Sequence, residues 1–142
     1  MIRVETRATL DAGAVEIWRT IRDFNGLPAF VPLIASSSVE GEGVGAIRRL
    51  IFTDGHEAVE TLEHLDDDAM TLRYSLVDSA ERPFRGYVAQ MFVRSLGERR
   101  CELTWSSSFE AQGGASEEEA REGPEGLYAQ GIEGLRKLHE AD

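Results

Sequence analysis

The later two-thirds of the chain has the pattern of a long run of strands followed by one helix, and this order constrains the fold most. Strand-forming residues recur in five segments, at 46–52, 58–65, 70–77, 87–96 and 101–111, separated by turns that contain Gly, Asp or Ser. The closing helical segment has an apolar stripe that one helix cannot bury alone. A curved sheet can cover that stripe with its concave face. We therefore expect an α+β fold in which the sheet and the last helix enclose a cavity.

The N-terminal part adds two strands and two short helical segments. Residues 1–10 alternate between apolar and polar side chains, as a half-buried strand does. Asp11 is a candidate N-cap for a helix over 14–21, where apolar residues recur at helical spacing. The apolar segment 27–33 holds two prolines and predicts a short helical turn, and 36–40 predicts a short strand. The expected order is therefore β-α-α-β6-α, with seven strands.

The last helix has recognisable start signals. Ser116 and Glu119 have the spacing of a capping box. We expect the main helix to restart at Gly123-Pro124, because proline suits a first turn and damages a helix interior. The buried stripe is expected to consist of Leu127, Tyr128, Gly131, Ile132, Leu135 and Leu138.

Three glycines interrupt this helix, and two explanations for them remain open. Gly126, Gly131 and Gly134 each cost about 1 kcal/mol relative to alanine at a helix interior position. They can permit close packing against the first helices. Alternatively, they can loosen the helix so that it shifts as a ligand enters.

Composition argues against several classes of function. The 142 residues suffice for one domain with a substantial core, expected to span 1–142. The 26 acidic and 15 basic side chains give a net charge of −11, which disfavours binding to nucleic acid or to anionic lipid surfaces. Cys101 is the only cysteine, and we find neither a signal peptide nor an apolar stretch long enough to span a membrane. We therefore expect a cytoplasmic protein, monomeric or homodimeric, that does not insert into membranes.

Two charged residues are expected to face the cavity. If 53–55 form a three-residue hairpin loop, Arg48 lies opposite Glu60 and both point inward. A two-residue loop would instead place Arg49 opposite Glu60. We prefer the longer loop because glycine commonly ends it. The pair can be a salt bridge that only stitches the hairpin, or a polar anchor that orients a ligand, and both interpretations remain open.

Several segments in this order resemble a known family. They are Gly43-Val-Gly-Ala-Ile-Arg48, Glu60-Thr-Leu-Glu-His-Leu-Asp-Asp67, Tyr87, Leu103-Thr-Trp105 and the following Phe109. From first strand to last helix, the chain resembles the START-like helix-grip superfamily (SRPBCC), which includes polyketide cyclase/dehydrase and lipid-transport proteins. The resemblance implies a seven-stranded antiparallel sheet that grips the C-terminal helix around an elongated apolar cavity. It also implies binding of lipids, hormones, polyketides or other hydrophobic molecules, with enzymes as a minority.

One branch of this family, the abscisic-acid receptors, allows two positions to be carried over. The resemblance implies that Glu60 faces the pocket and reaches a ligand through water, and that Tyr87 lines the pocket. Two departures disfavour a hormone receptor. The segment 53–56 lacks the leucine-proline pair of that branch's gate, and 27–35 lacks its carboxylate-binding lysine.

Our first hypothesis is a binding protein for a small hydrophobic ligand such as a lipid, a polyketide or another aromatic or isoprenoid-like molecule. The segment 27–33 and the turn at 54–55 are expected to border the mouth of its cavity. The predicted ligand contacts are Phe30, Val31, Arg48, Glu60, Tyr74, Tyr87, Met91, Trp105, Tyr128, Ile132 and Leu135.

Two further hypotheses remain. An enzyme of the polyketide cyclase/dehydrase kind could use Glu60 or His56 as a base, with Tyr87 among the candidate catalytic residues. Confinement of a flexible chain would supply much of such catalysis. A protein-partner module is the third hypothesis. No cofactor is predicted, and no metal site either, since the histidines and the cysteine do not cluster in the sequence.

Overall fold

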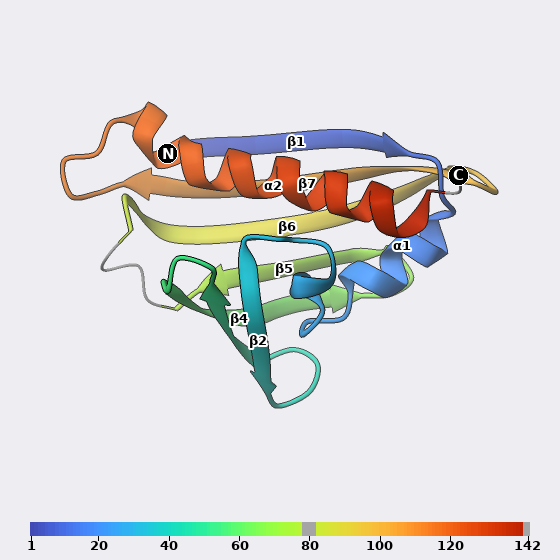
Figure 1. The fold of residues 1–142 in the computed structure, drawn as a ribbon, viewed down its shortest axis with the longest axis horizontal. Coiled ribbons are helices and arrows are strands. Elements are labelled where there is room, and N and C mark those ends of the chain that lie inside the picture. The colour runs from blue at the N-terminus through green and yellow to red at the C-terminus, as the bar shows by residue number, and fades with distance from the viewer. Residues whose placement is uncertain (78–81, 141–142) are drawn as a thin grey trace.

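Seven antiparallel strands form a single sheet in the computed structural model, which describes residues 1–77 and 82–140, and a long helix lies across one face of that sheet (Figure 1). The strand order is β1-β7-β6-β5-β4-β3-β2, so the first strand pairs with the last. This is the predicted helix-grip architecture, with each strand ending within three residues of its predicted limits. The elements are β1 (Ile2–Leu10), α1 (Ala14–Ile21), η1 (Leu27–Ala29), β2 (Ile34–Glu40), β3 (Ile47–Phe52), β4 (Glu57–Asp66), β5 (Thr71–Leu76), β6 (Phe84–Gly97), β7 (Arg100–Ala111) and α2 (Glu117–His139).

The start signal predicted for α1 is wrong. Gly13, not Asp11, is the N-cap residue, and no side chain caps the helix. The Gly13 carbonyl accepts the first helical hydrogen bond, from the amide of Ile17. Asp11 lies too early to cap α1, and its backbone amide donates instead to the carboxylate of Glu140, beyond the end of α2.

Helix α2 starts as predicted but does not restart at Gly123-Pro124. The capping box between Ser116 and Glu119 is present, and the helix runs without a break from Glu117 to His139 with Pro124 inside it. Proline cannot donate the hydrogen bond of a helix interior. The Pro124 ring is buried, and the helix continues through this position without a break.

The buried stripe of α2 follows the prediction except at Leu127, which is half-buried, and at its end. Tyr128, Gly131, Ile132 and Leu135 are buried, but Leu138 is 51% exposed. The next position, His139, faces α1 instead, where its ring Nε2 lies 2.7 Å from the hydroxyl oxygen of Thr20. The stripe therefore extends toward the start of the helix, through the buried Ala120 and Pro124.

Of the four glycines in α2, two lie where a side chain would collide with a neighbouring element. A Cβ atom at Gly134 would lie 1.8 Å from the carbonyl oxygen of Phe30, just after η1. A Cβ atom at Gly131 would lie 2.6 Å from the Trp105 ring, whereas one at Gly126 would meet nothing within 4 Å. Close packing thus accounts for Gly131 and Gly134, and not for Gly126.

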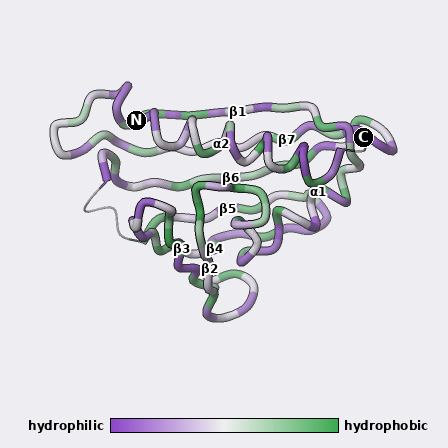
Figure 2. The backbone as a smooth tube through the Cα atoms, viewed as in Figure 1, coloured by the Kyte–Doolittle hydropathy of each residue, from purple (hydrophilic) through white to green (hydrophobic). Residues whose placement is uncertain are grey.

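Hydropathy follows the layers of the fold. Rows of alternate residues on β5, β6 and β7 are buried, as strand parity predicted, while hydrophilic turns recur along α2 (Figure 2). Among residues 1–77 and 82–140, no helix combines the length and the apolar character that crossing a membrane requires. The largest fully buried side chains include Trp105, Tyr128 and Phe109.

Candidate ligand-binding pocket

The hairpin between β3 and β4 has the predicted three-residue loop. The amide of Phe52 donates to the carbonyl of His56 at 2.8 Å, and Gly55 adopts a φ of +91°. In this register Arg48 lies opposite Glu60. Both side chains are buried, with 3% and 7% of their surfaces exposed. The inward-facing pair predicted from the loop length is confirmed.

The Arg48 guanidinium is fully engaged by its surroundings. Its Nε and Nη2 atoms lie 2.8 and 2.7 Å from one oxygen, Oε1 of Glu60, and Nη1 donates to the carbonyl of Phe24 at 3.3 Å. The rings of Phe24 and Tyr74 cover it, with centroids 4.1 and 4.6 Å from Cζ. Such contacts offset the desolvation of a buried charge.

Glu60 keeps one oxygen available. Its Oε1 atom accepts the hydrogen bond from Arg48 Nε and forms the ion pair with Nη2, whereas Oε2 accepts none from any residue in the described part of the chain. Glu60 also lines a pocket. The carboxylate can therefore accept a hydrogen bond from a hydroxyl, an amine or a water molecule inside that pocket.

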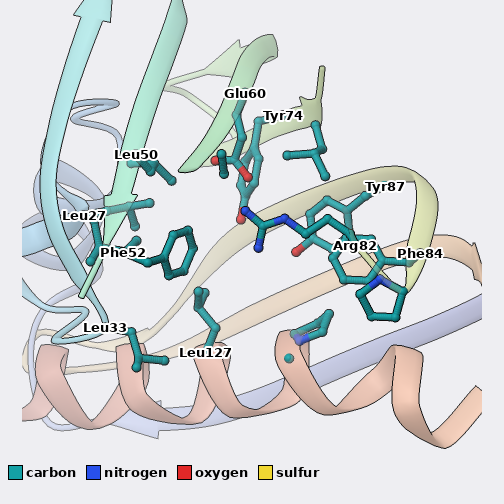
Figure 3. Close-up of a pocket in the computed structure, with 16 residues that line it drawn as sticks. Leu27, Leu33, Leu50, Phe52, Glu60, Tyr74, Arg82, Phe84, Tyr87 and Leu127 are labelled. Atoms are coloured by element: carbon teal, nitrogen blue, oxygen red, sulfur yellow. The ribbon is translucent and has the colours of Figure 1, made fainter. Parts of the chain in front are cut away.

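The pocket has a volume of about 230 Å³ and lies between β3–β6 and the first half of α2, with η1 and the start of β2 at its side (Figure 3). Most of its walls are aliphatic or aromatic, and Glu60 and Arg82 are the charged residues among them. The lining residues are Leu27, Leu33, Ile34, Leu50, Phe52, Ala58, Glu60, Tyr74, Leu76, Arg82, Pro83, Phe84, Tyr87, Gly123, Pro124 and Leu127.

Three buried tyrosines place neutral hydroxyl groups beside and behind this pocket. Trp105 Nε1 donates to the hydroxyl of Tyr74 at 3.1 Å, and the hydroxyls of Tyr87 and Tyr128 hydrogen-bond to each other. Burial, the largest cause, raises the pKa of each of these tyrosines well above its ordinary value. All three therefore keep their protons near neutral pH, and because one hydroxyl of the Tyr87–Tyr128 pair donates to the other, one proton of that pair remains for a further acceptor.

The structure separates the predicted ligand contacts into two groups. Glu60, Tyr74 and Tyr87 line the pocket, and Arg48 lies behind Glu60. The others belong to the packed interior, where the stacked rings of Trp105 and Tyr128, 4.5 Å between centroids, fill the space under α2. Those interior residues are Phe30, Val31, Met91, Trp105, Tyr128, Ile132 and Leu135.

His56, a candidate base, lies outside the lining. It is exposed on the hairpin, where its Nδ1 atom lies 2.8 Å from Oδ2 of Asp54. Hydrogen bonding to His56 lowers the pKa of the Asp54 carboxyl. The segment 27–33 does border the pocket, through Leu27 and Leu33, but Asp54 and Gly55 do not line it.

Sequence reasoning missed several lining residues. Leu50 and Leu76 share faces with residues assigned to the inside, so strand parity could have identified them. Phe84 lies before the predicted start of β6. Arg82 lies in the sequence segment 79–86, which has no periodic pattern, so only its neighbours in space reveal its place.

The model of a family described as polyketide cyclase/dehydrase and lipid transport matches residues 1–140. The chain belongs to this family. The resemblance seen in the sequence is therefore confirmed. No curated protein matches the chain in sequence.

Solved structures agree with the polyketide cyclase/dehydrase and lipid transport family assignment. XoxI from Bacillus cereus is 26% identical, with a TM-score of 0.89 over 98% of this chain and 96% of that one. An uncharacterised protein from Bacillus thuringiensis is 25% identical, with a TM-score of 0.86 over 96% and 98%. A protein from Thermobifida fusca is 26% identical, with a TM-score of 0.79 over 96% and 91%.

Proposed function

We propose that this chain binds and carries a small hydrophobic ligand, a lipid, a polyketide or a related aromatic or isoprenoid-like molecule, in the pocket beneath the first half of α2. The observation that carries the proposal is Glu60 Oε2, a carboxylate oxygen without a partner among residues 1–77 and 82–140, in a wall that is mostly apolar. Binding sites for small molecules combine apolar walls with a few convergent polar groups. The family description, which includes lipid transport, agrees with this function.

Native mass spectrometry of the freshly purified chain, beside its denatured mass, tests the proposal. We expect an additional mass that is lost on denaturation. A bare native mass, together with no thermal stabilisation by a panel of lipid and polyketide-like compounds, would refute ligand carriage.

A matched pair of variants on α2 ties the added mass to this pocket. Leu127→Trp places an indole ring at a lining position, so it should reduce or abolish the added mass. Leu138→Trp makes the same change at an exposed position of the same helix, so the added mass should remain. Equal retention by both variants would place the ligand elsewhere.

The alternative is an enzyme of the cyclase/dehydrase kind, which the same carboxylate favours. Glu60 Oε2 could accept a proton from a bound poly-β-ketone, while the neutral Tyr87 hydroxyl, also in the lining, donates a hydrogen bond to the developing oxyanion. Glu60→Gln distinguishes the two functions. Loss of turnover of a poly-β-ketone substrate with retained binding would favour the enzyme, and parallel loss of both would favour the carrier.

A further inference from the structure

Arg82 is a cation at the pocket that has no acidic partner among the described residues. Its Nη2 atom donates to the backbone carbonyl of Glu57 at 2.8 Å, and its Cζ atom lies 5.4 Å from the centroid of the Phe52 ring. No carboxylate in residues 1–77 and 82–140 forms an ion pair with it. Figure 3 shows the side chain extending across the pocket toward Phe52.

Two hydrogen bonds from Gln112 hold the backbone at Arg82 and at the next residue. The Gln112 side-chain amide donates to the Arg82 carbonyl at 3.0 Å, and the Gln112 backbone amide donates to the carbonyl of Pro83 at 3.0 Å. The side chain of Glu57, whose backbone carbonyl accepts from Arg82, is instead paired with Arg49. The guanidinium is thus positioned at the pocket by backbone contacts, and no carboxylate of residues 1–77 or 82–140 is paired with it.

The net charge of the pocket lining and its buried ion pair differs in sign from the net charge of the whole chain. The negative charge of Glu60 is matched by the buried Arg48, which leaves the positive charge of Arg82. The chain as a whole carries −11. An apolar pocket with a net positive charge in an acidic protein favours an anionic ligand over a neutral or cationic one.

We propose that the ligand is a small anionic amphiphile whose carboxylate pairs with Arg82 while its apolar body fills the pocket. This inference rests on the proposed function and specifies the ligand class. A planar guanidinium matches a carboxylate through two parallel hydrogen bonds. A volume of about 230 Å³ accommodates roughly eight to twelve non-hydrogen atoms, which corresponds to a medium-chain or phenyl-substituted acid.

Isothermal titration with charged and neutral probes of equal shape tests this inference. The probes are octanoate and 4-phenylbutanoate, each beside its primary amide. We expect the acids to bind the wild-type chain about fivefold more tightly than the amides, since a partly exposed ion pair contributes about 1 kcal/mol. Added salt should reduce the difference.

Two variants with the same change in net charge locate the effect. Arg82→Gln should abolish the preference for acids, because it should weaken acid binding more than amide binding. Arg85→Gln should keep the preference, because Arg85 is exposed, pairs with Glu110 and does not line the pocket. Arg82→Lys keeps the positive charge but not the planar guanidinium, so it should keep part of the preference for acids. This variant provides a second test if Arg82→Gln folds poorly.

The possible results separate this inference from the function on which it rests. Equal binding of acid and amide by the wild type, or a preference that persists in Arg82→Gln, would overturn the role of Arg82 while leaving ligand binding intact. If neither acid nor amide binds, and Leu127→Trp changes nothing, the proposed function itself fails.

Discussion

Adding one methyl group at Gly134 should destabilise the protein, although alanine is the better helix former. The Cβ atom of Gly134→Ala would lie 1.8 Å from the Phe30 carbonyl oxygen, 2.7 Å from its carbon and 3.0 Å from Cα. A carbon–oxygen contact needs about 3.3 Å, so α2 and the Phe30 backbone would have to separate by about 1.5 Å. All three obstructing atoms belong to the backbone, so a rotamer change cannot relieve the clash.

The two opposing contributions can be estimated. Overpacking of a close contact costs about 1–3 kcal/mol, and the upper part of that range applies to a backbone clash. Replacing a helix glycine by alanine stabilises by about 1 kcal/mol. We therefore expect Gly134→Ala to lower the free energy of unfolding by about 2 kcal/mol.

The same substitution at Gly126 provides the control. A Cβ atom there meets nothing within 4 Å, so only the gain in helix propensity remains. Gly126→Ala should raise the free energy of unfolding by about 0.5–1 kcal/mol. Urea unfolding followed by circular dichroism should show midpoints displaced in opposite directions, by about 1 M for Gly134→Ala. A Gly134→Ala midpoint at or above that of the wild type would refute the close-packing explanation.

Three further predictions concern buried polar groups. Arg48→Met should lower the free energy of unfolding by about 3 kcal/mol, because it leaves the Glu60 carboxylate without its cation, and the double variant Arg48→Met/Glu60→Leu should recover much of that loss in urea unfolding. All three tyrosines have a raised pKa in the folded state, so their contribution to stability should be complete below about pH 10 and fall above it. Absorbance at 295 nm, which reports tyrosine ionisation, should therefore rise together with alkaline unfolding. Gradual ionisation of the folded protein would contradict this prediction. Burial raises the pKa of the Cys101 thiol to about 11, so Ellman's reagent should react with it only after denaturation, and rapid reaction of the native protein would show that β7 opens locally.

The fold and the polar pair could be predicted because their signals are local. Alternation fixed which strand faces were buried, and a glycine at the end of the loop at 53–55 fixed the register that brings Arg48 opposite Glu60. The capping box of α2 is likewise determined within four residues. The two local signals that misled the prediction were Asp11, whose backbone amide contacts the distant Glu140, and Pro124, which lies inside a continuous helix.

The extent of the pocket could not be predicted in the same way. Parity says that Trp105 points inward, and helical spacing says that Tyr128 does, but neither says whether space remains between them. Their rings stack at 4.5 Å and fill that region, so inward-facing residues became core rather than lining. Arg82 illustrates the opposite case, since its segment has no periodicity and its position depends on Glu57 and Gln112, 25 and 30 residues away.

The composition of α2 explains why the pocket lies under only one half of the helix. In its second half, Gly131 and Gly134 lack the side chains that would hold the helix away from Trp105 and Phe30, and the layers close together. In its first half, Gly123, Pro124 and Leu127 line the pocket, and a Cβ atom at Gly123 would meet nothing within 4 Å. The glycines therefore have different effects along one helix. Gly131 and Gly134 allow α2 to pack closely against Trp105 and Phe30, whereas the absence of a side chain at Gly123 leaves space for the pocket. If this is correct, Gly123→Leu should reduce binding of the acids and the amides equally, without the selective loss expected for Arg82→Gln.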